Sequence, residues 1–172
     1  MGGHFLRYDP SKDRVFDETS LWTWDETGEL NVLKQIYGYF QDSWERYEEG
    51  KIRNIVPCGF SVSDRDIPLL FMRSVHREVD ERTNLYDCYF NTYPLDLAHV
   101  SVPFFNRNID VLYRKGMNRV CRRFAVGEQK PAGSNVWELY DSEKFGDIQE
   151  RTRKEVHVSL DLYREILKRC KD

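Results

Sequence analysis

Apolar and polar residues alternate along two segments at the start of the chain. Residues 4–8 and 14–24 have the composition of strands, and the five residues between them are rich in turn formers. This pattern predicts a β-hairpin. Alternation places one set of side chains on one face of the second strand, Val15, Asp17, Thr19, Leu21 and Thr23, and a second set on the other, Phe16, Glu18, Ser20, Trp22 and Trp24.

The apolar period changes from two to about 3.6 after the hairpin. Between residues 29 and 49 large apolar side chains recur at helical spacing, namely Leu30, Leu33, Ile36, Tyr37, Phe40, Trp44 and Tyr47. Gly50 is a typical residue for ending such a helix. We interpret the stripe as a core-facing surface, because aromatic stripes at this spacing are more often core than cofactor site.

A short apolar segment at residues 54–59 predicts a strand that leads into a polar loop and then into a helix behind Asp66. Pro68 falls in the first turn of that helix, where proline is favoured. Asp66 is therefore expected at the end of a strand and the start of a helix, where ligands gather in open α/β sheets. Its ordinary interpretation is a helix cap, and the alternative is a metal ligand.

Residues 59–70 read G-F-S-V-S-D-R-D-I-P-L-L. This segment resembles the second motif of the DnaQ-like, or DEDD, 3′-5′ exonucleases, which is roughly G-Y-N-x-x-x-F-D-I-P-L-L. In the resemblance Asp66 matches the catalytic aspartate, and Ser61 holds the place of the usual asparagine. Similarity to the branch related to polymerase proofreading domains extends to Y-P-L-D-L-A at residues 93–98, V-W-E-L-Y at residues 136–140 and the last helix.

The resemblance implies an α/β fold with a ribonuclease-H-like mixed sheet flanked by helices, and the length of 172 residues favours a single domain over residues 1–172. The first family motif, F-D-x-E-T, has no good counterpart. In F-D-E-T at residues 16–19 the acids Asp17 and Glu18 are adjacent, so in a strand they point to opposite faces. The hairpin then resembles the second and third strands of the family, and the first strand is absent or lies upstream. A missing strand leaves an edge that favours dimerisation.

The segment from residue 147 to residue 170 predicts a long final helix. Its apolar stripe contains Arg151 and Glu155, one turn apart, and charges in such a stripe must be paired or face a cleft. In the family this helix carries the third motif, where Glu155 takes the place of an aspartate and Arg151 that of a tyrosine. A permanently charged guanidinium beside Glu155 disfavours Mg²⁺. We therefore expect a decayed metal site, with Arg151 paired to Glu155 or Asp66.

Basic residues concentrate in a region from Phe104 to Phe124, which Pro103 opens and which we predict to be helical. This region contains one acid, Asp110, and six basic residues, namely Arg107, Arg114, Lys115, Arg119, Arg122 and Arg123. The ordinary interpretation is a solvated helix face. The alternative is a surface that follows a phosphate backbone, for which these six residues are the candidate nucleic-acid or partner contacts together with Ser61 and Arg151.

The composition of the chain argues against several classes of protein. The chain has 172 residues and a formal net charge of −3, which does not suggest non-specific coating of nucleic acid. Four cysteines stand far apart without a C-x-x-C pair, so structural zinc is not expected, and the four histidines show no paired ligand spacing. We expect no membrane span and a cytoplasmic location. Residues 127–135 are predicted to be a loop, and residues 85–100 a strand or extended segment that leads to a turn.

Two functions follow from these expectations. The first is a non-catalytic accessory module that binds nucleic acid or a protein partner in replication or repair, with no cofactor. The alternative is an active 3′-5′ exonuclease on single-stranded nucleic acid, which needs Mg²⁺ or Mn²⁺ held by Asp66 and Glu155 with Asp17, Glu18 or Asp96 completing the site.

Overall fold

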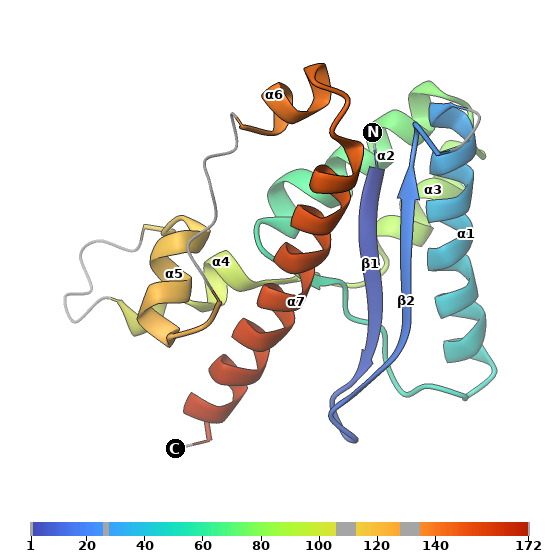
Figure 1. The fold of residues 1–172 in the computed structure, drawn as a ribbon. Coiled ribbons are helices and arrows are strands. Elements are labelled where there is room, and N and C mark those ends of the chain that lie inside the picture. Colours follow the sequence, from blue (N-terminus) through green and yellow to red (C-terminus); the bar gives the residue numbers. More distant parts are fainter. Residues whose placement is uncertain (1, 26–27, 106–112, 128–134, 172) are drawn as a thin grey trace. The chain divides into compact units, whose positions relative to one another are not determined.

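The computed structural model of the chain describes residues 2–25, 28–105, 113–127 and 135–171. It has a mixed α/β fold with seven α-helices among these residues, in keeping with the predicted class (Figure 1). The chain forms two compact units. The first comprises residues 1–2 and 21–96, and the second comprises residues 3–20 and 97–172. The predicted single domain stays a prediction.

The predicted hairpin is confirmed. Strand β1 (Gly2–Asp9) and strand β2 (Arg14–Trp22) form a two-stranded sheet and run in opposite directions (Figure 1). The turn is stabilised by Asp9, whose Oδ1 accepts hydrogen bonds from the backbone N–H of Ser11 at 2.9 Å and from its hydroxyl at 2.6 Å. The two adjacent acids of β2 have different partners in β1, because Asp17 pairs with Arg7 and Glu18 with His4.

Three helices build the core of the first unit: α1 (Glu29–Glu48), α2 (Ile67–His76) and α3 (Arg82–Phe90). They pack on one another around buried Tyr37, Ile67, Leu85, Cys88 and Tyr89. The predicted core stripe of α1 is confirmed for Leu33, Ile36, Tyr37, Phe40 and Trp44, whereas Leu30 and Tyr47 at its ends are 41% and 43% exposed. Helix α1 ends in a Schellman motif, in which Gly50 has φ 70° and the backbone N–H of Lys51 donates to the carbonyl of Arg46 at 2.9 Å.

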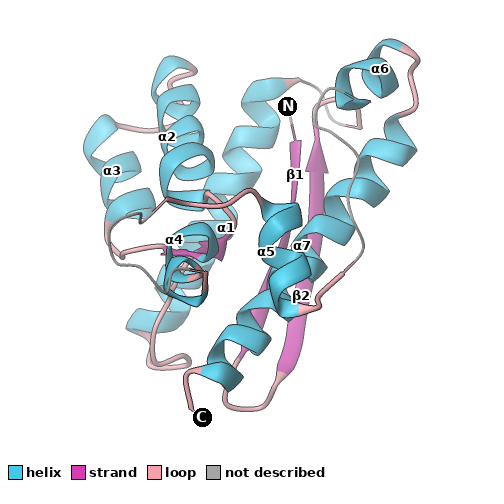
Figure 2. Cartoon of the chain, turned by 90° about the vertical axis from the view of Figure 1, so that its left-hand side faces the viewer, coloured by secondary structure: helices cyan, strands magenta, loops and turns pink. Residues whose placement is uncertain are grey.

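One prediction for the first unit is wrong, and another is confirmed only in part. Residues 82–90 form helix α3 instead of an extended segment, because Leu85, Cys88 and Tyr89 bury one face at helical spacing. The strand predicted at residues 54–59 is limited to β3 (Cys58–Gly59), which pairs in parallel with β4 (Leu95–Asp96). Helices predominate over strands in the described part of the chain (Figure 2).

The described strands therefore form two separate sheets of two strands each. A mixed α/β fold is established, whereas the larger ribonuclease-H-like sheet is not confirmed. Between β3 and α2 lies a single π-helical turn, Val62–Asp66.

The helices of the second unit are α4 (Leu97–Val100), α5 (Met117–Phe124), α6 (Asn135–Asp141) and α7 (Phe145–Arg169), with a 3₁₀ turn at Val102–Phe104. Helices α4, α5 and α6 each pack against α7, which confirms the predicted final helix. No described helix is both long and apolar enough to cross a membrane.

The helical region predicted for residues 104–124 is confirmed only in part. Residues 113–116 are not helical, and α5 begins only after Gly116. Glycine weakens helices, and here it occupies the position before the first turn with an extended backbone. Arg107 and Asp110 lie outside the described residues, as does most of the predicted loop at residues 127–135.

Candidate functional site

Asp66 occupies the predicted position at the start of α2. It is exposed, its backbone is already helical, and its side chain makes no capping hydrogen bond. The π-helical turn in front of α2 explains this, because the helical backbone begins before Asp66 and leaves no non-helical cap residue there. Asp66 thus has the predicted location, but its ordinary interpretation as a side-chain cap is wrong.

Ser61, at the asparagine position of the motif, has a left-handed backbone with φ 64° and ψ 23°. Its backbone N–H donates to Oδ1 of Asp96 at 3.0 Å. The other carboxylate oxygen of Asp96 accepts hydrogen bonds from the N–H of Ser63 at 3.2 Å and from its hydroxyl at 2.6 Å. Asp96 is 4% exposed. It therefore holds the loop between β3 and α2, which is a structural role.

Arg151 and Glu155 are paired, as their one-turn spacing predicted. Nε of Arg151 donates to Oε1 of Glu155 at 3.1 Å, and the two side chains are 14% and 32% exposed. This pair belongs to the second unit and Asp66 to the first. The convergence of Asp66 with Arg151 and Glu155 stays a prediction.

The basic positions divide between a helix and the segment before it. Arg114 and Lys115 precede α5, whereas Arg119, Arg122 and Arg123 are exposed on it. The opposite face of α5 is buried through Met117, Val120, Cys121 and Phe124. Helix α5 is thus amphipathic, with arginine the only charged residue type on its outer face.

Two of these arginines also bond to backbone. Nε of Arg123 donates to the carbonyl of Phe104 at 3.0 Å, and Nε of Arg122 donates to that of Asn118 at 3.3 Å. From Tyr113 to Gly127 the sequence contains no acid at all. No residue between 113 and 127 therefore supplies a carboxylate to Arg119, Arg122 or Arg123.

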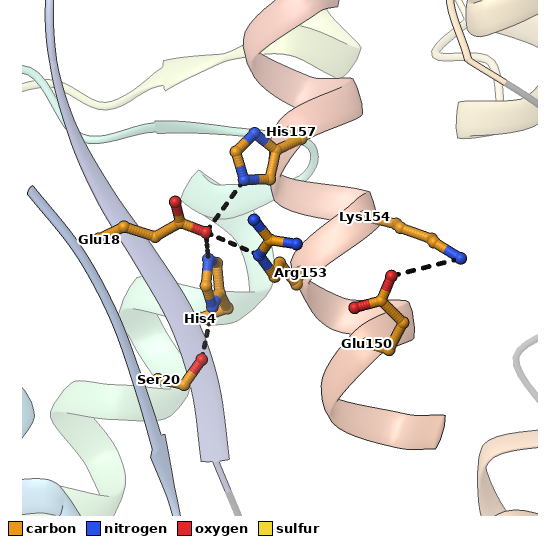
Figure 3. A network of polar contacts seen from close by, with 7 residues as sticks. All are labelled: His4, Glu18, Ser20, Glu150, Arg153, Lys154 and His157. Carbon is orange, nitrogen blue, oxygen red and sulfur yellow. Dashed lines mark hydrogen bonds and ion pairs between the residues drawn. The ribbon is translucent and has the colours of Figure 1, made fainter. Parts of the chain in front are cut away.

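A polar network that the sequence did not predict joins the hairpin to α7 within the second unit (Figure 3). Oε1 of Glu18, on β2, lies 2.8 Å from Nε2 of His4 on β1 and 3.0 Å from Nε2 of His157 on α7. Arg153, one turn before His157, donates from Nε to the same oxygen at 2.9 Å. Nδ1 of His4 lies 2.5 Å from the hydroxyl of Ser20.

The hydrogen-bond partners of Glu18 lower the pKa of its carboxyl group. The hydrogen bond with His157, followed by those with Arg153 and His4, lowers the pKa of Glu18 to about 2. Glu18 is therefore a carboxylate at neutral pH. One ligand atom from each of His4, Glu18 and His157 lies within 4.8 Å of the other two, which is close enough for the three residues to share one metal ion.

Sequence reasoning missed this group because its members are not local. His4 and His157 reach Glu18 from positions 14 and 139 residues away, so no ligand spacing is visible in the chain. The available signal was the alternation of β2, which placed Glu18 and Ser20 on one face. The cluster does not include the pair of Arg151 and Glu155, since His157 lies about 200° around α7 from Glu155.

Comparisons with models of protein families, with curated proteins and with solved structures found no match for this chain.

Proposed function

We propose that this chain is a non-catalytic accessory module that binds single-stranded nucleic acid through the arginine face of α5. We also propose that the chain has the exonuclease-like fold implied by the resemblance of residues 59–70, and that the metal site of this fold has decayed. Replication and repair are the processes in which the resemblance places such a module. The dimer expected from an unpaired strand edge belongs to the same proposal.

The observation that carries the proposal is the composition of the outer face of α5. Three arginines, Arg119, Arg122 and Arg123, are exposed on two turns of one helix, and no acid lies within the surrounding residues 113–127. Guanidinium groups bind phosphate oxygens in bidentate geometry and stack on bases, so such a face suits a phosphate backbone. Because the formal net charge of the whole chain is −3, the electrostatic attraction of nucleic acid is restricted to this local surface.

The pair of Arg151 and Glu155 supports the absence of catalysis. Two-metal nucleases need several carboxylates around their ions. Here the carboxylate at the third-motif position already bonds to a largely buried guanidinium at 3.1 Å. An ion at Glu155 has to displace that cation or share the carboxylate with it, and both disfavour Mg²⁺.

Fluorescence anisotropy with a labelled single-stranded DNA tests the binding. We expect the double variant Arg119→Gln/Arg122→Gln to bind about tenfold more weakly and to reduce the slope of log K against log salt by roughly 0.7 per lost phosphate contact. Arg14→Gln/Arg46→Gln is the matched control, because it removes the same charge from β2 and α1. Equal weakening by both double variants excludes α5 as the binding surface.

A nuclease assay tests the absence of catalysis. The labelled strand is incubated with the protein and Mn²⁺, and the Asp66→Ala variant is run alongside. We expect no shortening of the strand with either protein. Shortening that disappears in Asp66→Ala establishes the alternative, an active exonuclease. If the DNA does not bind at all, the proposal fails in favour of a protein partner.

A further inference from the structure

We propose that His4, Glu18 and His157 bind a divalent transition-metal ion of the zinc type. This inference concerns the second unit alone and is independent of the nucleic-acid proposal. Two imidazoles and one carboxylate form a donor set that suits Zn²⁺ and its first-row neighbours, whereas Mg²⁺ prefers oxygen ligands alone.

The donor atoms already converge on a common region (Figure 3). Nε2 of His4 and Nε2 of His157 lie 2.8 and 3.0 Å from the same oxygen of Glu18. In a tetrahedral zinc site with bonds near 2.0–2.1 Å, neighbouring ligand atoms are roughly 3.3 Å apart. Each histidine nitrogen therefore needs to move only a few tenths of an ångström away from Oε1 of Glu18 to reach the spacing of zinc ligands.

The second ring nitrogen of His4, Nδ1, has an oxygen partner of the kind found in metal-binding histidines. Metal-binding histidines usually use their second ring nitrogen to bond an oxygen, which fixes the orientation of the ring. Nδ1 of His4 lies 2.5 Å from the hydroxyl of Ser20, and the His4 side chain is 4% exposed. When Nδ1 is the donor, Nε2 presents its lone pair toward Glu18, where a cation stabilises both groups.

Arg153 now occupies part of this region as a competing cation. Its Nε donates to Oε1 of Glu18 at 2.9 Å, and its side chain is 52% exposed. An exposed arginine on a helix has room to swing into solvent or to move to the second oxygen of Glu18. Metal binding therefore displaces Arg153 from Oε1, and its positive charge lowers the affinity for the ion.

Three protein ligands leave one position of a tetrahedral ion open. Glu18 and His157 are 30% and 38% exposed at their side chains, so an ion has access from solvent and keeps a water molecule.

Zinc titration in competition with a chromophoric chelator tests the proposal on the full chain. Cys58 and Cys170 are exposed free cysteines, and thiolates are zinc ligands in general, so all proteins carry Cys58→Ser and Cys170→Ser to exclude binding there. We expect one site per chain, and an affinity that falls at least tenfold in both His157→Gln and Glu18→Gln. His76→Gln, at an exposed histidine of α2, is the matched control and leaves the affinity unchanged.

Arg153→Gln distinguishes a metal site from a structural network. Because this variant removes the competing cation, we expect its zinc affinity to rise several-fold, whereas a merely structural role predicts no gain. Co²⁺ supplies an independent signal, since its visible bands report a four-coordinate site. Zinc binding that His157→Gln and Glu18→Gln leave unchanged, in variants with normal circular dichroism, overturns the proposal.

Discussion

Asp96 accepts two hydrogen bonds from Ser63, one from the hydroxyl at 2.6 Å and one from the backbone N–H at 3.2 Å. Together with the bond from the N–H of Ser61, these contacts fix the loop that leads into α2. Asp96→Ala leaves these donors without their acceptor, and we expect a loss of about 1–3 kcal/mol in the free energy of unfolding. Urea denaturation measures the change.

A graded series of substitutions checks this explanation. Ser63→Ala removes the bonds of the hydroxyl to Asp96 and, at 3.2 Å, to Oδ1 of Asp64, but it keeps the backbone bond to Asp96. It is expected to cost about 1 kcal/mol, less than Asp96→Ala. Ser11→Ala, at an exposed hydroxyl that bonds Asp9 in the hairpin turn, is the control and is expected to have a smaller effect. Equal effects of Asp96→Ala and Ser11→Ala contradict the role assigned to Asp96.

The backbone of Ser61 predicts a stabilising substitution. Its φ of 64° lies in the left-handed region, which asparagine tolerates better than serine. Since the bond to Asp96 uses the backbone N–H, Ser61→Asn keeps it, and we expect a gain of a few tenths of a kcal/mol in the free energy of unfolding. A β-branched residue is poorly suited to this region, so Ser61→Val is expected to lose about 1–2 kcal/mol. Thermal unfolding midpoints rank the two variants against the natural chain. If Ser61→Val is at least as stable as the natural chain, the left-handed assignment of Ser61 is contradicted.

The elements that could be predicted from the sequence are those with a local, repeated signal. The hairpin, α1 and α7 have clear periods of two or 3.6 over many residues, and Arg151 and Glu155 are one turn apart on one helix. Helix α3 was missed because its nine residues are rich in aromatic side chains that favour strands. The cluster around Glu18 was missed because it depends on packing between the hairpin and α7, which no local pattern encodes.

The helical structure of residues 82–90 predicts different effects of substitutions at Leu85 and Asp87. In a strand Leu85 and Asp87 share a face, whereas in a helix Leu85 shares its face with Cys88. Leu85 is fully buried and Asp87 is exposed. We therefore expect Leu85→Ala to lose about 2–5 kcal/mol in the free energy of unfolding and Asp87→Ala to stay within about 0.5 kcal/mol. Comparable losses in urea denaturation at both positions contradict the helical assignment.

Gly127 packs closely against α7 with a backbone that favours glycine. Its φ is 62°, and a Cβ at this position meets Cγ2 of Val158 at 2.8 Å. Gly127→Ala is expected to lose about 1–2 kcal/mol from the backbone strain and the collision together. Val158→Ala removes the collision but not the strain, so the double variant is expected to recover part of the loss. A double-mutant cycle in urea measures this coupling, and a coupling below about 0.3 kcal/mol contradicts close packing.

Glu29 makes the stability of the first unit depend on pH. Arg73 donates to both of its carboxylate oxygens, at 2.7 and 2.5 Å, and Nε of Arg77 donates at 2.7 Å. The hydrogen bonds from Arg73, and after them that from Arg77, lower the pKa of Glu29 from 4.5 to about 2. Because the pKa of the folded state is depressed, the stabilisation is complete above pH 4.5 and is lost as the pH falls toward 2.

A comparison of the natural chain with Glu29→Gln isolates this contribution. One pKa unit corresponds to about 1.4 kcal/mol, and solvent screening at the half-exposed Arg77 reduces the full value, so we expect a difference on the order of 1–2 kcal/mol at pH 7. The difference is expected to shrink steadily between pH 4.5 and 2 in urea denaturation. Glu48→Gln, at an exposed acid on the same helix, is the control. A difference that persists unchanged at pH 2 shows that packing, and not the charge on Glu29, joins α1 to α2.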